Sequence, residues 1–264
     1  ELHDSDVQAR FFLSLVSMRE GRWSEAVLTL REAAAQPAAR PSIFHNLAYA
    51  LERLGHLDEA REMLNEAIAR GGGDDPRIRT SFGVLALRSG EVEDANLAFS
   101  AARTLLAKRI PSPAWFHYAS LAAGLAGDLD RALALITEGV KAHPQAAVLG
   151  NTLAAVQERR GDFAAAALAA EAAMAEDGTI PQLHKNLGDY FYRASRYEEA
   201  LDQYQRAIKI DPALGDDVYF KLGNIRFKWQ EKEQALAYWE RALSLNPDNE
   251  ILRTNLELAR TTGS

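Results

Sequence analysis

Residues 184–212, HKNLGDYFYRASRYEEALDQYQRAIKIDP, contain the pattern that decides the fold of this chain. Their first half carries a stripe at the i, i+3, i+4 and i+7 spacing of one helix face: His184, Leu187, Gly188 and Phe191. A second apolar stripe with helical spacing begins at Tyr197, and Pro212 ends it because proline cannot continue a helix. The segment therefore predicts two amphipathic helices joined by a turn at Ser195.

The same pattern recurs along the chain with a period of 34 to 37 residues. Seven turn positions are Gly21, Gly55, Gly90, Gly127, Gly161, Ser195 and Gln230. Five residues after each turn position stands an alanine, the repeat alanine: Ala26, Ala60, Ala95, Ala132, Ala166, Ala200 and Ala235. Seven residues further on stands a second small residue: Ala33, Ala67, Ala102, Gly139, Ala173, Ala207 and Ala242. Helices about 8–10 Å apart need a residue without bulk where they approach, so this phasing predicts helical hairpins.

The pattern resembles the tetratricopeptide repeat. The motif of that family stands here as Leu187-Gly188, Phe191, Ala200, Tyr204, Ala207 and Pro212. It returns as Leu222-Gly223, Phe227, Ala235, Trp239, Ala242 and Pro247. The resemblance covers residues 7–248 and implies an all-α fold, a right-handed superhelical solenoid of seven helix-turn-helix repeats. It also implies a concave groove lined by the first helix of each repeat.

The phasing places the repeats at about 7–40, 41–75, 76–112, 113–146, 147–180, 181–215 and 216–248. Residues 249–260 have helical spacing and many polar side chains, which suits a C-terminal capping helix. We therefore expect residues 1–264 to form a single solenoid. Two positions depart from the family pattern: Gly139 replaces the second alanine, and Gly150 stands where a large apolar residue is usual.

Composition and charge exclude several classes of protein. Hydrophobic residues make up 47% of the chain and charged residues 25%, as in folded globular proteins. No stretch approaches 18 uninterrupted apolar residues, so membrane insertion is not expected. A net charge of −7 argues against general nucleic-acid binding. The chain has no signal-peptide pattern, so the cytoplasm is expected, or the periplasm if a signal sequence was removed; the absence of cysteine suits both compartments. Its start at Glu1 suggests a fragment or a processed product.

The sequence carries no motif for catalysis, a cofactor or a metal. It contains no H-E-x-x-H, no phosphate-binding glycine loop followed by Lys-Ser/Thr, and no G-x-S-x-G. His45 and His117 lie two repeats apart, too far for one zinc ion. Gly71 to Asp75 is interpreted as a helix end, a flexible link and an Asp cap before Pro76. The sequence therefore predicts a protein that is not an enzyme.

A basic residue stands two positions before most turn positions: Arg19, Arg53, Arg88, Arg159, Arg193 and Lys228, with Leu125 as the exception. Because these positions lie on first helices, they predict an electropositive track suited to an acidic or C-terminal peptide. An equally weighted interpretation is structural, since a basic residue is common at this place in the family and stabilises the C-terminal end of a helix.

Amides and aromatic rings accompany this track on the first helices. The amides are Asn46, Asn151, Asn186 and Asn224, which can donate to and accept from a peptide backbone, or can bridge neighbouring repeats. Tyr49, Tyr192 and Phe227 would add apolar contacts, and Lys185 would add charge. Co-chaperone members of the family hold a terminal carboxylate with Lys and Asn one turn apart. Here Lys185 is followed by Asp189, and Lys221 replaces the next Asn, so chaperone tails are not expected.

A second contact is predicted in the first repeat, where Phe11, Leu15 and Met18 form an apolar stripe on the groove face. Ser14 and Ser17 occupy places that are normally apolar. Either upstream sequence or a partner helix packs on this stripe, or the helix register of a terminal repeat is shifted.

These features predict a non-catalytic scaffold that holds a peptide or helix of a partner protein in its concave groove, with an acidic ligand as one option. The resemblance implies work in assembling a bacterial complex of a pilus, secretion, envelope or signalling system. The alternative is a regulatory or targeting arm of a larger enzyme, because members of the family are fused to methyltransferases, glycosyltransferases and kinases. A homo-oligomer is possible, although nothing in the sequence indicates one.

Overall fold

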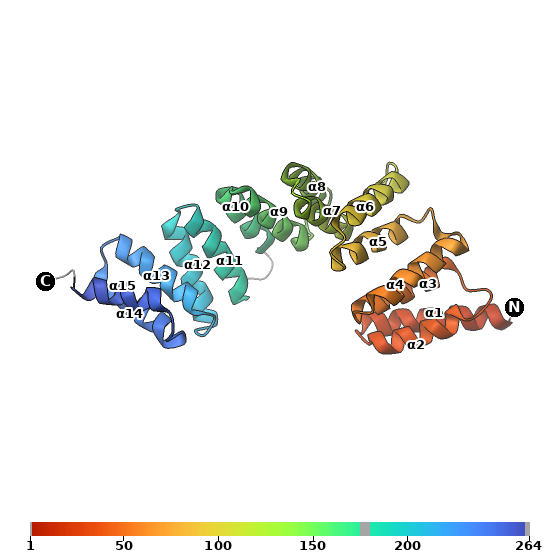
Figure 1. The fold of residues 1–264 in the computed structure, drawn as a ribbon, viewed down its shortest axis with the longest axis horizontal. Coiled ribbons are helices and arrows are strands. Elements are labelled where there is room, and N and C mark those ends of the chain that lie inside the picture. The colour runs from red at the N-terminus through yellow and green to blue at the C-terminus, as the bar shows by residue number, and fades with distance from the viewer. Residues whose placement is uncertain (1, 175–179, 262–264) are drawn as a thin grey trace. The chain divides into compact units, whose positions relative to one another are not determined.

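The computed structural model describes residues 2–174 and 180–261, which form consecutive helical hairpins (Figure 1). The regular structure of these residues consists of α-helices and one short π-helical turn, with no strand. The predicted all-α fold is therefore confirmed. The chain divides into two compact units, Glu1–Pro144 and Gln145–Ser264, each of which is described by itself. Among the described helices, none has both the length and the apolar character to cross a membrane.

The first unit contains four hairpins. They pair α1 (Leu2–Arg19) with α2 (Trp23–Ala34), α3 (Pro41–Arg53) with α4 (Leu57–Ala67), α5 (Pro76–Arg88) with α6 (Val92–Leu106), and α7 (Pro113–Leu125) with α8 (Leu129–Ala142). The π-helical turn η1 (Ile68–Gly72) extends α4. The second helix of each of the first three hairpins also packs against the first helix of the next, so the hairpins stack.

The second unit contains three hairpins and a final helix. They pair α9 (Ala147–Arg160) with α10 (Phe163–Met174), α11 (Pro181–Arg193) with α12 (Tyr197–Ile210), and α13 (Asp216–Lys228) with α14 (Lys232–Leu245). The final helix, α15 (Glu250–Thr261), packs on α14. It buries Leu252, Leu256 and Ala259 and exposes Ile251 and Leu258. The last hairpin is thus covered on one side by the predicted capping helix.

The repeat alanines are buried where the helices pack together. All seven are completely buried, and so are five of the six alanines at the second small position. Gly139 is also buried, while Ala173 is half-buried. Alanine has no atoms beyond Cβ and carries no helix penalty, so it permits close packing without weakening the helix. The sequence period is therefore set by packing within and between hairpins.

A second recurring contact within the hairpins packs a glycine of the first helix against an aromatic ring of the second. Three glycines on first helices face an aromatic ring sixteen residues later: Gly83 with Phe99, Gly188 with Tyr204, and Gly223 with Trp239. A Cβ added to any of these glycines would lie within 2.6 Å of a ring atom. In the first hairpin Ser14 holds the same register position and is completely buried. The position that appeared unusual for a serine is therefore one that requires a small residue.

The two departures from the family pattern, Gly139 and Gly150, both lie where the first and second helices of a hairpin contact each other. In the fourth hairpin, a Cβ on Gly139 would lie 2.7 Å from the buried ring of Phe116. In the fifth, the equivalent first-helix residue is Gly150, whose added Cβ would lie 2.7 Å from Ala173 Cβ. A glycine thus accommodates a large ring in the fourth hairpin and meets an alanine in the fifth, so packing stays close in both.

The turn between the two helices of a hairpin requires a left-handed residue. The five glycines at this position have φ between 74° and 87°. Ser195 and Gln230 hold the position in the last two hairpins with φ of 60° and 64°. Side chains with a Cβ adopt this conformation at a cost of about 1–2 kcal/mol, so the second unit carries strain that the glycine turns avoid.

In two connections between hairpins, a side chain caps the N-terminus of the helix that follows. Asp75 Oδ1 accepts a hydrogen bond from the backbone N–H of Arg77 at 2.9 Å, as predicted for the link before Pro76. Ser112 Oγ accepts one from the backbone N–H of Trp115 at 3.2 Å. These caps satisfy donors that the first turn of a helix leaves free.

Candidate protein-interaction surfaces

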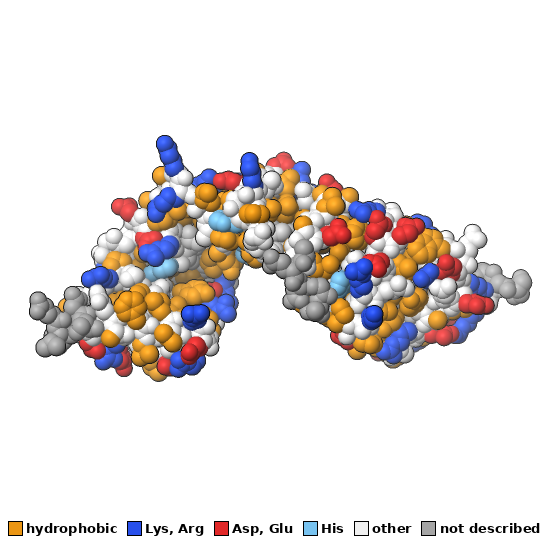
Figure 2. Space-filling model, turned by 180° about the vertical axis from the view of Figure 1, so that it is seen from behind, with side chains coloured by type: hydrophobic (Ala, Val, Ile, Leu, Met, Phe, Trp, Pro, Cys, Tyr) orange, Lys and Arg blue, Asp and Glu red, His pale blue; other side chains and the backbone are white. Residues whose placement is uncertain are grey.

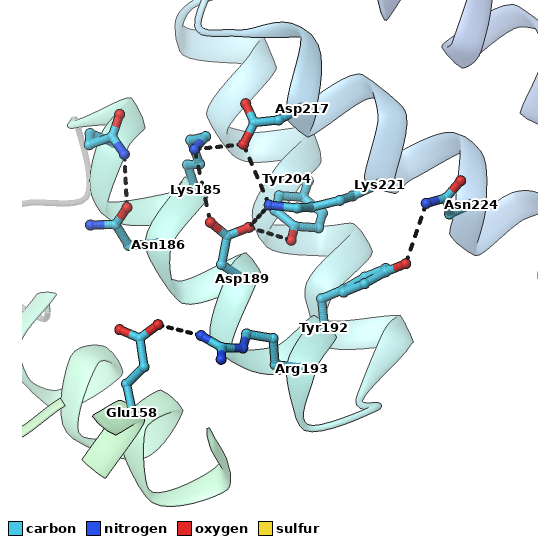
Figure 3. A network of polar contacts seen from close by, with 11 residues as sticks. Glu158, Lys185, Asn186, Asp189, Tyr192, Arg193, Tyr204, Asp217, Lys221 and Asn224 are labelled. Carbon is cyan, nitrogen blue, oxygen red and sulfur yellow. Dashed lines mark hydrogen bonds and ion pairs between the residues drawn. The ribbon is translucent and has the colours of Figure 1, made fainter. Parts of the chain in front are cut away.

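Four charged side chains form a closed cluster, the ionic quartet, on α11 and α13 of the second unit (Figure 3). Lys185 Nζ lies 2.8 Å from an oxygen of Asp217 and 3.9 Å from an oxygen of Asp189. Lys221 Nζ lies 2.6 Å from Asp189 and 3.4 Å from Asp217. Two cations and two carboxylates balance one another, so the quartet has no spare charge for an acidic ligand.

The environment of the quartet favours the charged forms of Lys185 and Asp217. Burial lowers the pKa of Lys185, but its hydrogen bond to Asp217 and the nearby carboxylates outweigh burial, so the pKa is raised. Burial raises the pKa of Asp217, but Lys185 and Lys221 outweigh it, so this pKa is lowered. Tyr204 donates its hydroxyl to Asp189 Oδ1 at 2.7 Å, and burial and this carboxylate raise the pKa of Tyr204. Asp189 therefore anchors groups from three helices.

Two of the predicted groove arginines join neighbouring hairpins. Arg88 on α5 pairs with the carboxylate of Glu52 on α3, and its Nη1 donates to the Glu52 carbonyl oxygen at 2.9 Å. Arg193 on α11 pairs with Glu158 on α9 at 2.5 Å. Both carboxylates stand eight residues before a repeat alanine, and both arginines stand seven before the next. The same link thus recurs in both units, which favours the structural interpretation for Arg88 and Arg193.

Several other predicted groove residues of the second unit also bond within the chain. Asn224 Oδ1 accepts a hydrogen bond from Trp239 Nε1 at 3.1 Å, and its amide nitrogen donates to the Tyr192 hydroxyl at 3.5 Å. Lys228 Nζ donates to the Tyr197 hydroxyl at 3.1 Å. These bonds connect α13 to α11, α12 and α14, so they favour the bridging role that the sequence left open.

The remaining predicted groove residues of this unit lie at its surface. Asn186 is exposed, and its side-chain oxygen accepts a hydrogen bond from Gln182 at 2.8 Å. Asn151 and Arg159 on α9 are exposed and make no side-chain hydrogen bond or ion pair with other described residues. Phe227 on α13 is 47% exposed. Asn151, Arg159 and Phe227 are therefore available to a ligand.

The first unit presents a different surface on α3. The guanidinium carbon of Arg53 lies 5.0 Å from the centroid of the Trp23 ring, and Tyr49 meets the same ring edge-on with centroids 5.8 Å apart. Arg53 is exposed and has no carboxylate partner in the described part of the chain, while Tyr49 is 42% exposed. Asn46 lies one turn before Tyr49 and is half-buried. This corner of the first unit offers a cation and an aromatic face.

A cavity of about 280 Å³ lies beside this corner, between α3, α5 and α7. Much of its wall is apolar or aromatic: Tyr49, Leu64, Val84, Leu85, Ala114 and Tyr118. Its polar groups are largely bonded within the chain. The Thr80 hydroxyl donates to the Pro76 carbonyl oxygen at 2.8 Å, and Ser81 Oγ lies 2.9 Å from His45 Nε2. Burial lowers the pKa of His45, so its ring is neutral at pH 7.

The three residues of the predicted second contact on α1 have different environments. Phe11 and Met18 pack partly against the core of the first unit, whereas Leu15 is 37% exposed. Over residues 6–19 of α1, the exposed large apolar side chains are Phe12, Leu13, Leu15 and Val16. Ser14 and Ser17 are buried, and their hydroxyls donate to backbone carbonyls within α1. The apolar surface of this helix therefore lies mainly beside the predicted stripe.

Charges of both signs are mixed over the surface. On the side of each unit seen in Figure 2, Lys and Arg side chains are interspersed with Asp and Glu. In the described part of the chain, no group of three or more His, Asp or Glu side chains is placed to hold a metal ion. The electropositive track remains a prediction, carried by the unpaired Arg53 and Arg159.

Sequence reasoning missed the carboxylate partners of the basic residues. Asp189 and Lys221 were noted only as departures from a known clamp, and Glu52, Glu158 and Asp217 were not considered. A signal was present, because Lys185 and Asp189 are one turn apart and the next repeat holds Asp217 and Lys221 one turn apart in the opposite order. Two such pairs on adjacent helices place each cation beside a carboxylate.

Helical hairpins that repeat along the chain, each with a buried alanine at the same position, define a helical-repeat protein. Proteins of this class commonly bind other proteins. Family models of the tetratricopeptide repeat match residues 17–81, 188–230 and 217–249. The chain belongs to the tetratricopeptide repeat family. Such repeats are generally non-catalytic modules that bind proteins or peptides, which makes this chain a protein–protein interaction scaffold.

Known proteins resemble the chain over different lengths. It is 26% identical over 99 residues to the small glutamine-rich tetratricopeptide repeat-containing protein 2 of Mycosarcoma maydis, a match of 38% of this chain and 28% of that protein. Part of a repeat protein from Cytophaga hutchinsonii has a TM-score of 0.72 at 14% identity, covering 93% of this chain and 99% of that one. YrrB, described as having an unusual peptide-binding site, has a TM-score of 0.64 at 17% identity, with 74% and 97% covered. Pseudomonas aeruginosa pilF has a TM-score of 0.64 at 13% identity, with 83% and 96% covered.

Proposed function

We propose that this chain holds a peptide or a helix of a partner protein against the first helices of its repeats, in the predicted concave groove, and that it does so without catalysis. The observation that carries the proposal is the surface of α3, α5 and α7. There a cavity of about 280 Å³ adjoins the exposed ring of Tyr49 and the unpaired guanidinium of Arg53. Together these groups offer apolar area, hydrogen bonding and charge to a ligand.

The second unit supports the same proposal with fewer groups. Asn151 and Arg159 on α9 and Phe227 on α13 are exposed on first helices. An amide satisfies the backbone of an extended peptide whatever its side chains are, and an arginine attracts acidic ones. The peptide-binding site named for YrrB, whose fold is similar, agrees with this use of the repeats.

The cellular process in which the chain acts is proposed from its resemblance to known proteins. Similar folds occur in proteins of Cytophaga hutchinsonii and Pseudomonas aeruginosa, the latter a pilF protein. We propose that the chain takes part in the assembly of a bacterial pilus, secretion, envelope or signalling complex. The cytoplasm is the proposed compartment, with the periplasm as the alternative, since a chain without cysteine is suited to both.

Peptide selection followed by hydrogen exchange tests the proposal. Random dodecapeptides displayed on phage are selected on the immobilised full chain, and the enriched peptides are synthesised together with scrambled controls. We expect bound peptide, but not scrambled peptide, to slow amide exchange in α3, α5 and α7 or in α9, α11 and α13. Failure to enrich any peptide, or protection restricted to second helices such as α4 and α12, would refute binding on the first helices.

A further inference from the structure

The cavity of the first unit occupies the place that the ionic quartet fills in the second. Lys185 and Asp189 stand fifteen and eleven residues before their repeat alanine, and Asp217 and Lys221 stand eighteen and fourteen before the next. At the same distances from Ala95 and Ala132, the first unit has Thr80, Val84, Ala114 and Tyr118, all of which line the cavity. The chain fills this space with its own charged side chains in one unit and leaves it open in the other.

The size and walls of the cavity suit one large apolar side chain. A cavity of about 150 Å³ lined by apolar groups holds a benzene ring, so 280 Å³ accommodates an aromatic or large aliphatic side chain with part of its backbone. Leu64 and Leu85 are buried, and the rings of Tyr49 and Tyr118 lie in the wall. Burying an apolar side chain there removes apolar surface from water on both partners.

The charges at the cavity point to an acidic neighbour of that side chain. Glu52 is the carboxylate in the wall, and Arg88 neutralises it. Arg53 is also in the wall, is exposed, and has no carboxylate partner among the described residues. Its stacking on Trp23 at 5.0 Å holds the guanidinium in place while its N–H groups remain able to donate. A carboxylate is the group that such an arginine binds best.

We propose that this cavity binds a Phe, Tyr, Trp, Leu or Met side chain of a partner peptide, and that Arg53 pairs with an Asp or Glu adjacent to it on that peptide. The proposal rests on the proposed function, because it assigns a ligand chemistry to a surface already proposed to bind peptides. It differs from a general electropositive track, since one cation and one cavity specify two neighbouring residues of the ligand.

Two substitutions in the full chain test the two halves of the site. Ala114→Phe adds a ring at an exposed position in the cavity wall, and Arg53→Glu reverses the charge. Matched controls exist in the second unit. Ala164, like Ala114, is the exposed second residue of its helix, which gives Ala164→Phe. Lys209 is an exposed cation in the last turn of α12, a second helix outside the proposed binding surfaces, which gives Lys209→Glu.

The probe is the most enriched dodecapeptide from the phage selection, synthesised with a fluorescein label and titrated by fluorescence anisotropy. Enriched peptides should share a large apolar residue next to Asp or Glu. Ala114→Phe and Arg53→Glu should each weaken binding about ten-fold or more, and the two controls by less than about two-fold. Changing the acidic residue of the peptide to Lys should weaken binding to the natural chain and restore binding to Arg53→Glu. Replacing the apolar residue of the peptide by Ala tests the cavity without altering the protein.

The outcomes separate this inference from the proposed function. Enriched peptides that lack the apolar–acidic pair, or that bind Ala114→Phe and Arg53→Glu as tightly as the natural chain, overturn the inference. If such peptides still protect first helices from exchange, the proposed function stands and the binding site lies elsewhere on those helices. If no peptide is enriched, both fail.

Discussion

The first helices of the two units use equivalent positions in opposite ways. Between α11 and α13 lie four cation–carboxylate contacts, formed by Lys185, Asp189, Asp217 and Lys221. Between α5 and α7, the equivalent residues Thr80, Val84, Ala114 and Tyr118 surround a cavity. The hairpin pattern is common to both, and side-chain volume and charge distinguish the closed surface from the open one.

The comparison teaches that a repeat protein can assign stability and binding to different repeats of one architecture. Each repeat packs on its neighbours, so a contact across two hairpins affects mainly those hairpins. Closing the surface with paired charges stabilises the second unit but leaves few side chains there to bind a partner. Leaving it open in the first unit provides a binding surface without changing the buried alanines that hold the hairpins together.

Removing the central carboxylate of the quartet should produce the largest effect. Asp189→Val leaves Lys185, Lys221 and the Tyr204 hydroxyl partly buried without their common acceptor. We expect the free energy of unfolding of the second unit to fall by about 3 kcal/mol. Hydrogen exchange of α11 to α13 under native conditions measures it. Val84→Ala, at the equivalent position of the first unit, is the control and should cost about 1 kcal/mol or less.

Adding volume should distinguish a closed contact from an open one. Ala200→Leu forces a larger side chain into a completely buried helix contact and should destabilise the second unit by about 2 kcal/mol. Ala114→Leu adds the same atoms in the open cavity and should change stability by less than about 0.5 kcal/mol. Thermal unfolding followed by circular dichroism compares the two variants. Equal losses would mean that the cavity is not open space.

Mild acid should weaken the first unit before the second. Burial lowers the pKa of His45 and His117 below the ordinary 6.5, so the unfolded chain binds more protons and stability falls as pH drops below 6.5. Asp217 has a lowered pKa, so its contribution is present above 3.8 and is lost only as pH falls further, through its folded pKa. Exchange measured from about pH 7 to pH 5, corrected for intrinsic rates, should show α3 and α7 opening more while α13 is unchanged. In His45→Gln the response of α3 should be reduced.

Substitutions in the turns should give the smallest change in the free energy of unfolding. Ser195→Gly and Gln230→Gly remove a Cβ from a left-handed residue and should each stabilise the second unit by about 0.5–1 kcal/mol. The reverse change, Gly90→Ser, should destabilise the first unit by a similar amount. Urea unfolding of the three single variants measures these changes. A loss of stability in both glycine variants would show that the hydroxyl and amide side chains contribute more than the strain costs.

The fold was predictable because its determinants act over short distances in sequence. The repeat alanine, the turn residue and the glycine that faces Tyr204 all lie within one hairpin, so their spacing can be read directly. Glycines 139 and 150 were read as departures because their compensating partners, Phe116 and Ala173, become visible only when two helices are placed side by side.

The candidate site was predictable only in part. The first-helix positions of Tyr49 and Arg53 follow from the period. The partners of Arg88 and Lys185 do not, because Glu52 and Asp217 lie 36 and 32 residues away and the contacts depend on how one helix is rotated against the next. The cavity was the hardest feature to predict from the sequence. It exists because Ala114 and Val84 are small and uncharged, and neither residue type signals a binding site.

The balance of large and small residues inside each hairpin also constrains how such a chain can grow by duplication. Gly188 needs Tyr204 opposite it and Gly223 needs Trp239, whereas Gly139 needs Phe116. A duplicated segment that began in the middle of a hairpin would combine the first helix of one repeat with the second helix of another, leaving a void or a collision at these contacts. Duplications that begin and end between hairpins preserve every such pair. The connections around Asp75 and Ser112 are therefore where recombination breakpoints are expected to be tolerated.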